Sequence, residues 1–411
     1  MNKRIFFSVG EPSGDEHAAR LIRAIRRRDG DVRVRGFGGP EMRSAGCRLD
    51  RDLTGDAVVG LLEVLPKLRR FFRYADEAEQ IFARGEVDAV ILVDFPGFNW
   101  HIAKRARQFG IPVYYYCPPQ LWAWGRWRLR KLRRNVDEVL AVLPMEEQFF
   151  RDAGVPTWYV GHPFFDAVEE KPLEGRCLRR LEGEAATGVR HVAVLPGSRD
   201  HEVERNWPLM LQAIRKLAAR HPDAKFLVAS YRDRHCMGCR RQLTEADRLL
   251  PIEFFVDRTS EVIRASHCAM MVSGSVSLEL MARGTPAAVI YRVGRILHRF
   301  ARSVLHVRSI TLPNLMAGRN VFPEYVSVGN PRPAVDFLVA SLDAMLSDPY
   351  YHGGLVKELQ ALRERYALPG ASDRAAKRIL DHLRVSGYLG ATRAVPEVAT
   401  APPRVGSKSA A

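Results

Sequence analysis

The segment Met271–Pro286 contains a turn that could bind a phosphate group. Apolar residues over 269–272 predict the end of a buried strand, Ser273-Gly274-Ser275 predicts a tight turn, and 276–282 predicts a helix. Such a turn directs backbone N–H groups and the positive end of a helix dipole towards an anion. Glu279 could then accept hydrogen bonds from two sugar hydroxyls. In an ordinary βα turn, a serine would instead cap the helix and Glu279 would be solvated.

A second turn of the same kind occurs earlier in the chain. Val192–Leu195 predicts a short buried strand, Pro196-Gly197-Ser198-Arg199 follows it, and a helix is predicted from about Glu202. Arg199 at the end of this turn would add a charge-assisted contact to a bound phosphate. Two such turns in one half of the chain predict one site with two walls.

Asp94 is the candidate general base. It follows Val87–Val93, which predicts a buried strand, and it starts the segment Asp94-Phe-Pro-Gly-Phe-Asn99. In open α/β sheets, ligands bind at the carboxyl ends of the strands. An unpaired, partly buried carboxylate at that position would have a raised pKa and could take a proton from a hydroxyl group. The alternative is a helix cap or a turn residue.

The N-terminus predicts the first βα unit of an α/β domain. Ile5–Val9 has the pattern of a buried strand, 10–15 of a loop, and His17–Arg28 of a helix. Ser13 or Asp15 could cap this helix, or the loop could form a wall of the ligand site.

Tryptophans alternate with arginines over 122–134. This pattern could form a sugar and phosphate surface or a nucleic-acid surface, since aromatic rings stack on bases and cations pair with phosphates. The third interpretation is an amphipathic helix with a solvated basic face.

The segment 61–73 places large apolar side chains beside a cluster of basic ones. A buried helix would explain the apolar residues, whereas a basic amphipathic helix on an anionic lipid surface would also explain the cations. The predicted membrane-facing patch comprises Leu62, Val64, Leu65, Leu68, Phe71 and Phe72.

The composition is that of a globular protein of more than one domain. The 411 residues are 46% hydrophobic and 27% charged, and the formal net charge of +16 predicts an anionic partner. The six cysteines are too scattered for a disulfide framework, and Cys236-Met-Gly-Cys239 lacks a second Cys or His pair, so no metal site is predicted. No segment suits a signal peptide or a membrane span, so we expect any membrane contact to be peripheral.

Strands and helices alternate in both halves, which predicts two Rossmann-like α/β domains with parallel sheets that face a cleft. A polar stretch from Asp166 to about Arg190 marks the boundary. We predict an N-terminal domain over 1–168, completed by C-terminal helices over about 352–385, and a second domain over 169–351. Residues 387–411 are predicted to be a disordered tail, because their composition cannot form a core.

Seven motifs together resemble those of lipid-A-disaccharide synthases. They occur in the same order between residues 10 and 319, and the similarity extends to about residue 385. They are GEPSGD at 10–15, VDFPGFN at 93–99, WAW at 122–124, VGHP at 160–163, LPGSRxxE at 195–202, SGSxxLE at 273–279 and LPNLxAGR at 312–319. Each motif alone is weak, but the combination is specific.

The resemblance implies an inverting GT-B-type glycosyltransferase that needs no metal or other cofactor. It would transfer 2,3-diacylglucosamine from its UDP conjugate to the 6-hydroxyl of 2,3-diacylglucosamine 1-phosphate. The catalytic residues would be Asp94 as the base and Arg199. The donor site would comprise Gly197, Ser198, Arg199, Glu202, Ser273, Gly274, Ser275, Glu279, Asn314 and Arg319. The acceptor side would comprise Glu11, Ser13, Gly14, Asp15, Asn99, Trp122, Trp124 and His162.

The resemblance also implies a cytoplasmic protein that associates peripherally with the anionic inner leaflet, and it leaves open whether the protein is a homodimer. Two residues depart from the usual pattern. Gly97 stands where a second acidic residue is common, so Asp94 would be the only carboxylate in its loop. Ser327 stands where glutamine is usual, which affects one predicted donor contact.

Two other hypotheses remain open. Another UDP-sugar enzyme of the same fold, such as a 2-epimerase or the transferase that forms lipid II, would not need the apolar patch. A nucleic-acid-binding protein using Arg126–Arg134 would bind oligonucleotides with a strong salt dependence and would not bind UDP. The two phosphate-suited turns favour a UDP-sugar enzyme, and we predict no nucleic-acid partner.

Overall fold

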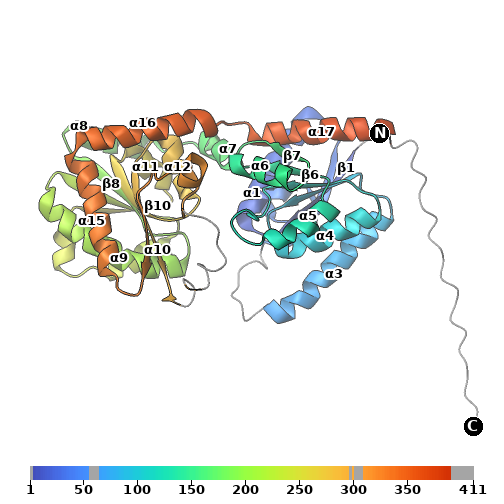
Figure 1. Ribbon diagram of the computed structural model, residues 1–411. Coiled ribbons are helices and arrows are strands. Elements are labelled where there is room, and N and C mark those ends of the chain that lie inside the picture. The colour runs from blue at the N-terminus through green and yellow to red at the C-terminus, as the bar shows by residue number, and fades with distance from the viewer. Residues whose placement is uncertain (1–2, 55–63, 296–298, 300–308, 390–411) are drawn as a thin grey trace, which may run out of the picture.

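The computed structural model of this chain consists of two α/β domains that lie side by side (Figure 1). It describes residues 3–54, 64–295, 299 and 309–389. Residues 387–389 of the predicted tail form the end of the last helix, whereas 390–411 and Leu62 of the predicted patch lie outside the described residues.

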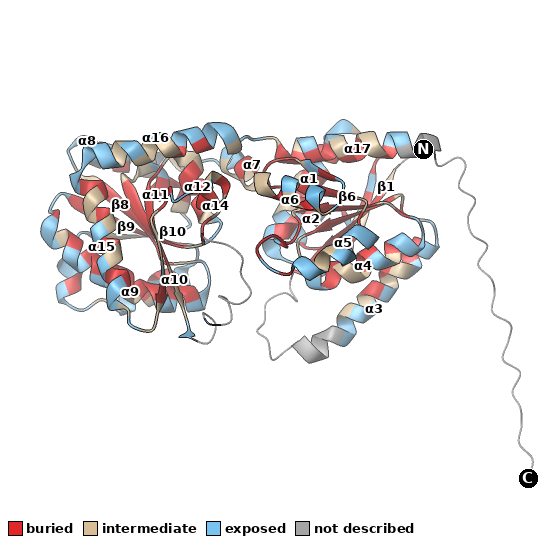
Figure 2. Cartoon of the chain, viewed as in Figure 1, coloured by how far each residue is buried: buried red, intermediate tan, exposed pale blue. Residues whose placement is uncertain are grey.

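The N-terminal domain is built on a seven-stranded parallel sheet in the order β3-β2-β1-β4-β5-β6-β7. Its strands are β1 (Arg4–Val9), β2 (Arg33–Gly38), β3 (Arg48–Asp52), β4 (Ala89–Val93), β5 (Val113–Tyr116), β6 (Glu138–Ala141) and β7 (Thr157–Tyr159). Its helices are α1 (Pro12–Arg28), α2 (Pro40–Ser44), α3 (Val64–Ala83), α4 (Pro96–Gln108), α5 (Leu129–Asn135), α6 (Pro144–Asp152) and α7 (Pro163–Glu170). Every residue of β4 and β5 is buried, because helices cover both faces of the sheet (Figure 2).

The second domain is built on a six-stranded parallel sheet in the order β10-β9-β8-β11-β12-β13. Its strands are β8 (Arg190–Leu195), β9 (Ala224–Ser230), β10 (Ile252–Val256), β11 (Cys268–Val272), β12 (Ala287–Val293) and β13 (Glu324–Val328). Its helices include α8 (Gly175–Ala186), α9 (Asp200–Arg220), α10 (Asp233–Arg241), α11 (Thr259–Ala265), α12 (Val276–Arg283), α14 (Leu312–Ala317) and α15 (Arg332–Ser347).

Two long C-terminal helices run along one side of both domains (Figure 1). Helix α16 (Pro349–Tyr366) packs against α12 and α15 of the second domain, whereas α17 (Ala371–Leu389) packs against α1 and α7 of the first. The prediction that the helices over 352–385 complete the N-terminal domain is therefore wrong for α16. The chain therefore crosses from the second domain to the first between α16 and α17. Helix α7 of the first domain also contacts α12 of the second, so the two domains touch there.

The prediction of two Rossmann-like parallel-sheet domains is confirmed. The polar stretch at the domain boundary contains α8, and the motif at 312–319 begins with the short helix α14. The Cys236–Cys239 segment lies in α10, whose two cysteines are buried. None of the helices in the described ranges has the length and hydropathy of a transmembrane helix.

Candidate active site

Asp94 and Phe95 form a strained turn at the carboxyl end of β4. Both residues have φ of 45°, in the left-handed region that side-chain-bearing residues rarely adopt. Two consecutive residues of this kind cost free energy and persist only where the surrounding structure holds them in place, and such positions cluster at functional sites.

Two buried side chains hold this turn through the carbonyl oxygen of Asp94. The Tyr115 hydroxyl donates to it at 2.8 Å and Asn99 Nδ2 at 2.7 Å. Asn99 Oδ1 in turn accepts from the Ser8 hydroxyl at 2.7 Å, and Asn99 is fully buried. Asn99 is therefore a positioning residue beneath Asp94 and not the direct acceptor contact that we predicted. Sequence reasoning missed Tyr115, because its role depends on β5 lying beside β4.

The predicted loop at 10–15 is shaped to fit the Asp94 turn. A side chain at Gly10 would overlap the Phe95 ring, and a Cβ at Gly14 would lie 3.1 Å from Val9 Cγ1 and 4.0 Å from Asp94 Cβ. The two glycines thus let the start of α1 approach the end of β4 closely. Gly14 therefore shapes the site through the backbone.

Burial raises the pKa of Asp94 to about 6, and the charge of Glu11 contributes in the same direction. The carboxylate is thus mostly ionised at neutral pH, yet it is more basic than an ordinary aspartate. This combination suits a group that accepts a proton from a sugar hydroxyl. Glu11 and Ser13 are exposed at the start of α1, where they remain candidates for the acceptor side.

Asp15 has a structural role that differs from the acceptor role we predicted. Its carboxylate accepts hydrogen bonds from the backbone amides of Gly39 at 3.0 Å, Glu41 at 2.9 Å and Met42 at 3.1 Å. It is buried and caps the start of α2. Because both carboxylate oxygens are already bound, Asp15 is not free to bind an acceptor.

His162 and Trp122 are also structural. His162 caps α7 by accepting the Phe164 amide at Nδ1, and burial lowers the pKa of His162 to about 3, which makes it a poor base. The Trp122 indole is buried and donates to Glu146 at 3.2 Å. Trp124 is partly exposed beneath the guanidinium of Arg128, so it alone of these three offers a surface to a ligand.

On the donor side, Glu202 holds the turn at 197–199. Its carboxylate accepts the backbone amides of Ser198 at 3.1 Å and Arg199 at 3.2 Å, and a guanidinium nitrogen of Arg199 at 3.2 Å. Gly197 has φ of 130°, and a side chain there would collide with Glu202. Glu202 therefore occupies two amides that we expected to bind phosphate, whereas 70% of the Arg199 side chain remains exposed.

The turn at 273–275 keeps its amides available. No hydrogen bond from the backbone amides of Gly274, Ser275 or Val276 is found among the described residues. The Ser273 hydroxyl donates to the carbonyl of Ile310 at 2.5 Å, which ties the turn to the chain before α14. Glu279 is buried and paired with Arg283 at 2.9 Å, so a sugar hydroxyl would have to share this carboxylate.

Asn314 is a clamp and not the direct donor contact that we predicted. Its amide accepts from the backbone of Val321 and Phe322 and donates to Glu324 at 2.9 Å, and it is buried. Arg319 is largely exposed, 3.5 Å from Glu358. Ser327 is fully buried on β13, so its hydroxyl does not reach the surface.

The last two residues of the predicted membrane patch have different environments, one in the core and one at the surface. The ring of Phe71 is partly buried and packs 5.4 Å from Phe98 and 5.7 Å from Phe95, so it belongs to the core beneath the Asp94 turn. The ring of Phe72 is 42% exposed and contacts only His101 among the described rings. The side chains of Val64, Leu65 and Leu68 lie outside the part that the structure describes, although α3 itself begins at Val64.

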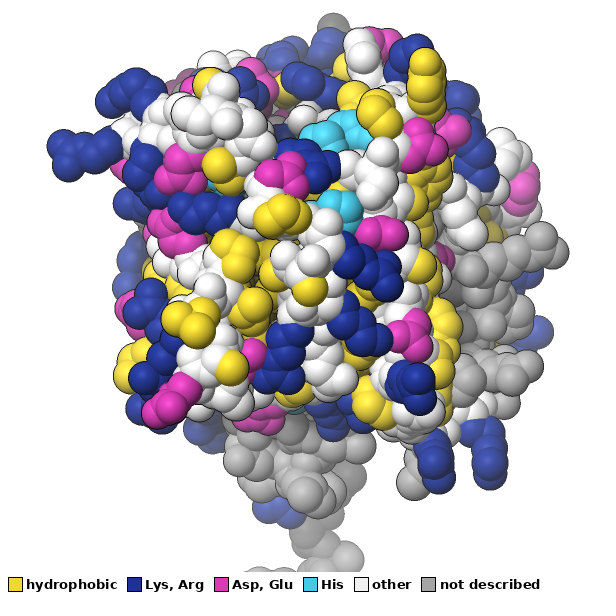
Figure 3. Space-filling view, turned by 90° about the vertical axis from the view of Figure 1, so that its left-hand side faces the viewer, with side chains coloured by type: hydrophobic (Ala, Val, Ile, Leu, Met, Phe, Trp, Pro, Cys, Tyr) yellow, Lys and Arg dark blue, Asp and Glu magenta, His cyan; other side chains and the backbone are white. Residues whose placement is uncertain are grey.

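The positive charge of the described residues in the second domain does not form a continuous patch on its outer face (Figure 3). On the outer face of the second domain, Lys and Arg side chains alternate with acidic and apolar ones (Figure 3). Across the described ranges, no group of three or more His, Cys, Asp or Glu side chains is arranged to hold a metal ion.

The sequence of the chain is similar to those of known proteins. The sequence model described as lipid-A-disaccharide synthetase matches residues 5–332. The chain belongs to the lipid-A-disaccharide synthase family. A lipid-A-disaccharide synthase of Syntrophus aciditrophicus is 36% identical over 386 residues, which cover 94% of this chain and 99% of the relative. One of Myxococcus xanthus is 35% identical over 382 residues, which cover 92% and 97%.

Solved structures show the same two-domain fold at low identity. A UDP-N-acetylglucosamine 2-epimerase of Neisseria meningitidis bound to UDP-GlcNAc has a TM-score of 0.62 at 12% identity and covers 93% of this chain and 100% of that one. A glycosyltransferase of Rickettsia africae has a TM-score of 0.58 at 11% identity and covers 93% and 99%. The family and the fold together make this member of the lipid-A-disaccharide synthase family a glycosyltransferase.

Proposed function

We propose that the chain transfers 2,3-diacylglucosamine from its UDP conjugate to the 6-hydroxyl of 2,3-diacylglucosamine 1-phosphate, with release of UDP. The observation that carries this proposal is the match of the family over most of the chain, together with a raised-pKa carboxylate at the end of β4. A sugar hydroxyl is too weak an acid to ionise unaided at neutral pH, so the transfer needs such a base.

In this proposal, Asp94 takes the proton of the acceptor hydroxyl as its oxygen attacks the anomeric carbon of the donor. Arg199 and the free amides at 274–276 stabilise the negative charge that develops on the UDP diphosphate. An inverting transfer needs the base on the face opposite the leaving group, which fits Asp94 in the first domain and the donor groups in the second. Closure of the two domains would assemble the site and dehydrate Asp94 further.

The acylated substrates reside in a membrane, so we also propose that the start of α3 rests on the anionic inner leaflet. Its basic and apolar residues suit an interfacial helix. A homodimer is compatible with this arrangement and is tested by sedimentation of the purified protein.

The decisive experiment is to incubate the purified protein with the UDP-diacylglucosamine donor and the diacylglucosamine 1-phosphate acceptor. We expect a disaccharide 1-phosphate and an equal amount of UDP. A parallel incubation with UDP-N-acetylglucosamine alone tests the epimerase alternative. A 2-epimer in that sample, without disaccharide in the first, would overturn the proposal.

A further inference from the structure

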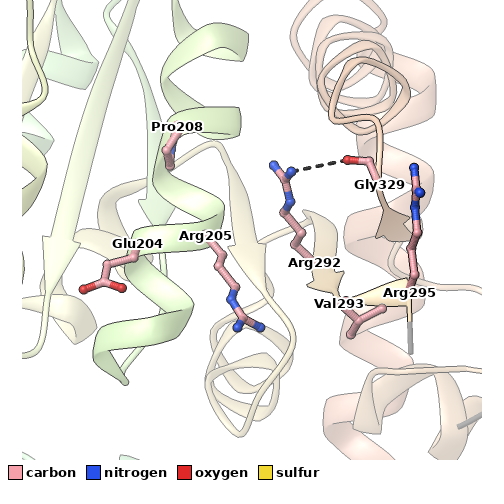
Figure 4. A pocket seen from close by; sticks show the side chains of 8 residues that line it. Glu204, Arg205, Pro208, Arg292, Val293, Arg295 and Gly329 are labelled. Carbon is pink, nitrogen blue, oxygen red and sulfur yellow. Dashed lines mark hydrogen bonds between the residues drawn. The ribbon is translucent and has the colours of Figure 1, made fainter. Parts of the chain in front are cut away.

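Three arginine side chains border a cavity of about 490 Å³ in the second domain (Figure 4). Arg205 comes from the second turn of α9, Arg292 from the end of β12, and Arg295 from the residues just beyond β12. Gly329, which follows β13, completes the wall beside the two latter residues.

Gly329 positions two of these arginines. Its carbonyl oxygen accepts a hydrogen bond from Arg292 Nη2 at 3.3 Å. Its φ of 71° is left-handed, and the Nε and Nη2 atoms of Arg295 lie 3.2 and 3.3 Å from the point where a Cβ would stand. A glycine is therefore needed both for the backbone and for the close approach of Arg295, and the carbonyl of Gly329 holds the guanidinium group of Arg292 before any ligand binds.

The positive charge of this pocket is not balanced by the protein. None of the three arginines forms an ion pair with any residue in the described part of the chain. Glu204 is the one acidic residue of the lining, and its carboxylate points away from the guanidinium groups (Figure 4). Like charges that border one pocket without a counter-charge repel one another, so the pocket favours an anion. The planar guanidinium group forms paired hydrogen bonds with phosphate oxygens.

The pocket lies at the edge of the sheet from which the donor turns also leave. Strands β8, β11 and β12 are neighbours in a parallel sheet, so their carboxyl ends lie at one edge. The pocket nevertheless shares no residue with the turns at 197–199 and 273–275, which are assigned to the UDP diphosphate. The proposed reaction has a second anionic group, the 1-phosphate of the acceptor.

We propose that the pocket of Arg205, Arg292 and Arg295 is a subsite for a phosphate monoester, filled by the 1-phosphate of the acceptor sugar. This assignment rests on the proposed function, and it gives the second domain a part in acceptor selection.

The first test compares two acceptors in steady-state kinetics, one with the 1-phosphate and one without it. The variant is Arg205→Gln with Arg295→Gln, because both side chains are exposed and unpaired, so the fold should be unaffected. We expect KM for the phosphorylated acceptor to rise by about tenfold or more, while KM for the donor and kcat stay within about twofold. KM for the acceptor without phosphate should be equal in the variant and in the native protein.

The matched control is Lys216→Gln with Arg220→Gln, which also removes two positive charges, in the last two turns of α9. There Lys216 pairs with Asp336 at 2.7 Å and Arg220 with Asp343 at 3.5 Å, both exposed. If this control raises the acceptor KM as much as the double variant does, the effect is that of net charge and the proposal is overturned. An equal rise in KM for both acceptors would also overturn it.

Two further measurements distinguish the acceptor phosphate from a lipid headgroup, and the failure of the subsite from the failure of the proposed function. If the double variant loses binding to phosphatidylglycerol vesicles but keeps the native acceptor KM, the occupant is a lipid headgroup and the acceptor assignment falls. Inorganic phosphate tests the pocket without any turnover: it should raise the melting temperature of the native protein and not that of the double variant. If no disaccharide forms, the proposed function fails. The pocket is rejected as a phosphate site only if inorganic phosphate shifts the melting temperature of the native protein and of the double variant equally.

Discussion

Asp94 is the residue on which the proposed chemistry depends most. Asp94→Asn keeps the shape of the side chain and removes its basicity, so we expect turnover to fall by about 10²- to 10⁴-fold while the affinity for UDP stays nearly unchanged. Because the base must be ionised and the pKa of Asp94 is about 6, kcat/KM of the native enzyme should decline as the pH falls below about 6. Loss of UDP binding in step with activity would make Asp94 a structural or donor-side residue.

The backbone of Asp94 gives a second prediction at the residue scale. Tyr115→Phe removes one of the two donors that hold the Asp94 carbonyl, so the carboxylate should spend less time in its active position. We expect kcat to fall by about tenfold with both KM values unchanged. The matched control is Tyr114→Phe on the same strand, which removes a buried hydroxyl that contacts His382 Nδ1 at 2.9 Å. Equal losses of kcat in the two variants would show that Tyr115 has only a structural role.

Arg199 offers the corresponding test on the donor side. Most of its side chain is exposed, so Arg199→Ala should leave the fold intact. We expect turnover to fall by at least about a hundredfold, because the UDP leaving group loses a charge-assisted contact that strengthens in the transition state. Near-normal turnover of this variant, measured by UDP release, would refute the assignment.

The sequence predicted where these residues lie but not what each one does. Asp94 and Arg199 could be placed because an apolar run followed by polar residues predicts a strand end in an α/β sheet. Asp15, Asn99 and Asn314 lie in equally suggestive motifs, yet each is bound to backbone groups outside its motif, at Gly39, Ser8 and Phe322 respectively. Such partners depend on tertiary packing, which the sequence pattern does not specify.

At the scale of elements, strongly periodic segments were predicted well, but two of the edge strands were not. Strands β3 and β13 were missed because, as edge strands that include polar residues, they lack a continuous apolar run. In α3 the helix was predicted, but its apolar residues were assigned to one surface. The structure instead divides Phe71 and Phe72 between the core and the surface.

This division gives a prediction for α3. Phe72→Ser should weaken binding to anionic vesicles with little change in stability, and the effect should grow when Leu65 and Leu68 are also replaced by Ser. Phe71→Ser should instead lower the free energy of unfolding by about 2 kcal/mol, because its ring packs against the core. Vesicle co-sedimentation and urea denaturation measure the two effects. A loss of stability in Phe72→Ser without a loss of vesicle binding would favour a buried role for this face.

At the scale of the whole molecule, the C-terminal crossover joins the two domains. The sequence predicted that terminal helices return to the first domain, but amphipathic periodicity does not specify which domain a helix covers. Helix α16 covers the second domain and α17 the first, and a single acidic residue of α7 fixes the point at which the chain changes domain. Asp166 accepts hydrogen bonds from the backbone amides of Gly370 at 2.6 Å, Ala371 at 3.1 Å and Ser372 at 2.9 Å.

The last prediction concerns this cap. Asp166→Ala leaves three amides and the Ser372 hydroxyl at the buried start of α17 without their acceptor, so we expect the free energy of unfolding to fall by about 2 kcal/mol or more. Asp373→Ala is the control, because Asp373 lies in the same first turn but forms only exposed ion pairs, and its loss should cost at most about 0.5 kcal/mol.

Activity should also depend on the cap that Asp166 forms at the start of α17, because α17 packs on α1 and the loop before α1 shapes the Asp94 turn. In Asp166→Ala, limited proteolysis between α16 and α17 should therefore accelerate, and turnover should be lost at a lower temperature than in the control, in parallel with that cleavage. If cleavage accelerates while turnover persists, α17 stabilises the first domain without supporting its site. If neither the cleavage rate nor the temperature at which turnover is lost changes, the packing of α17 on the first domain does not depend on Asp166.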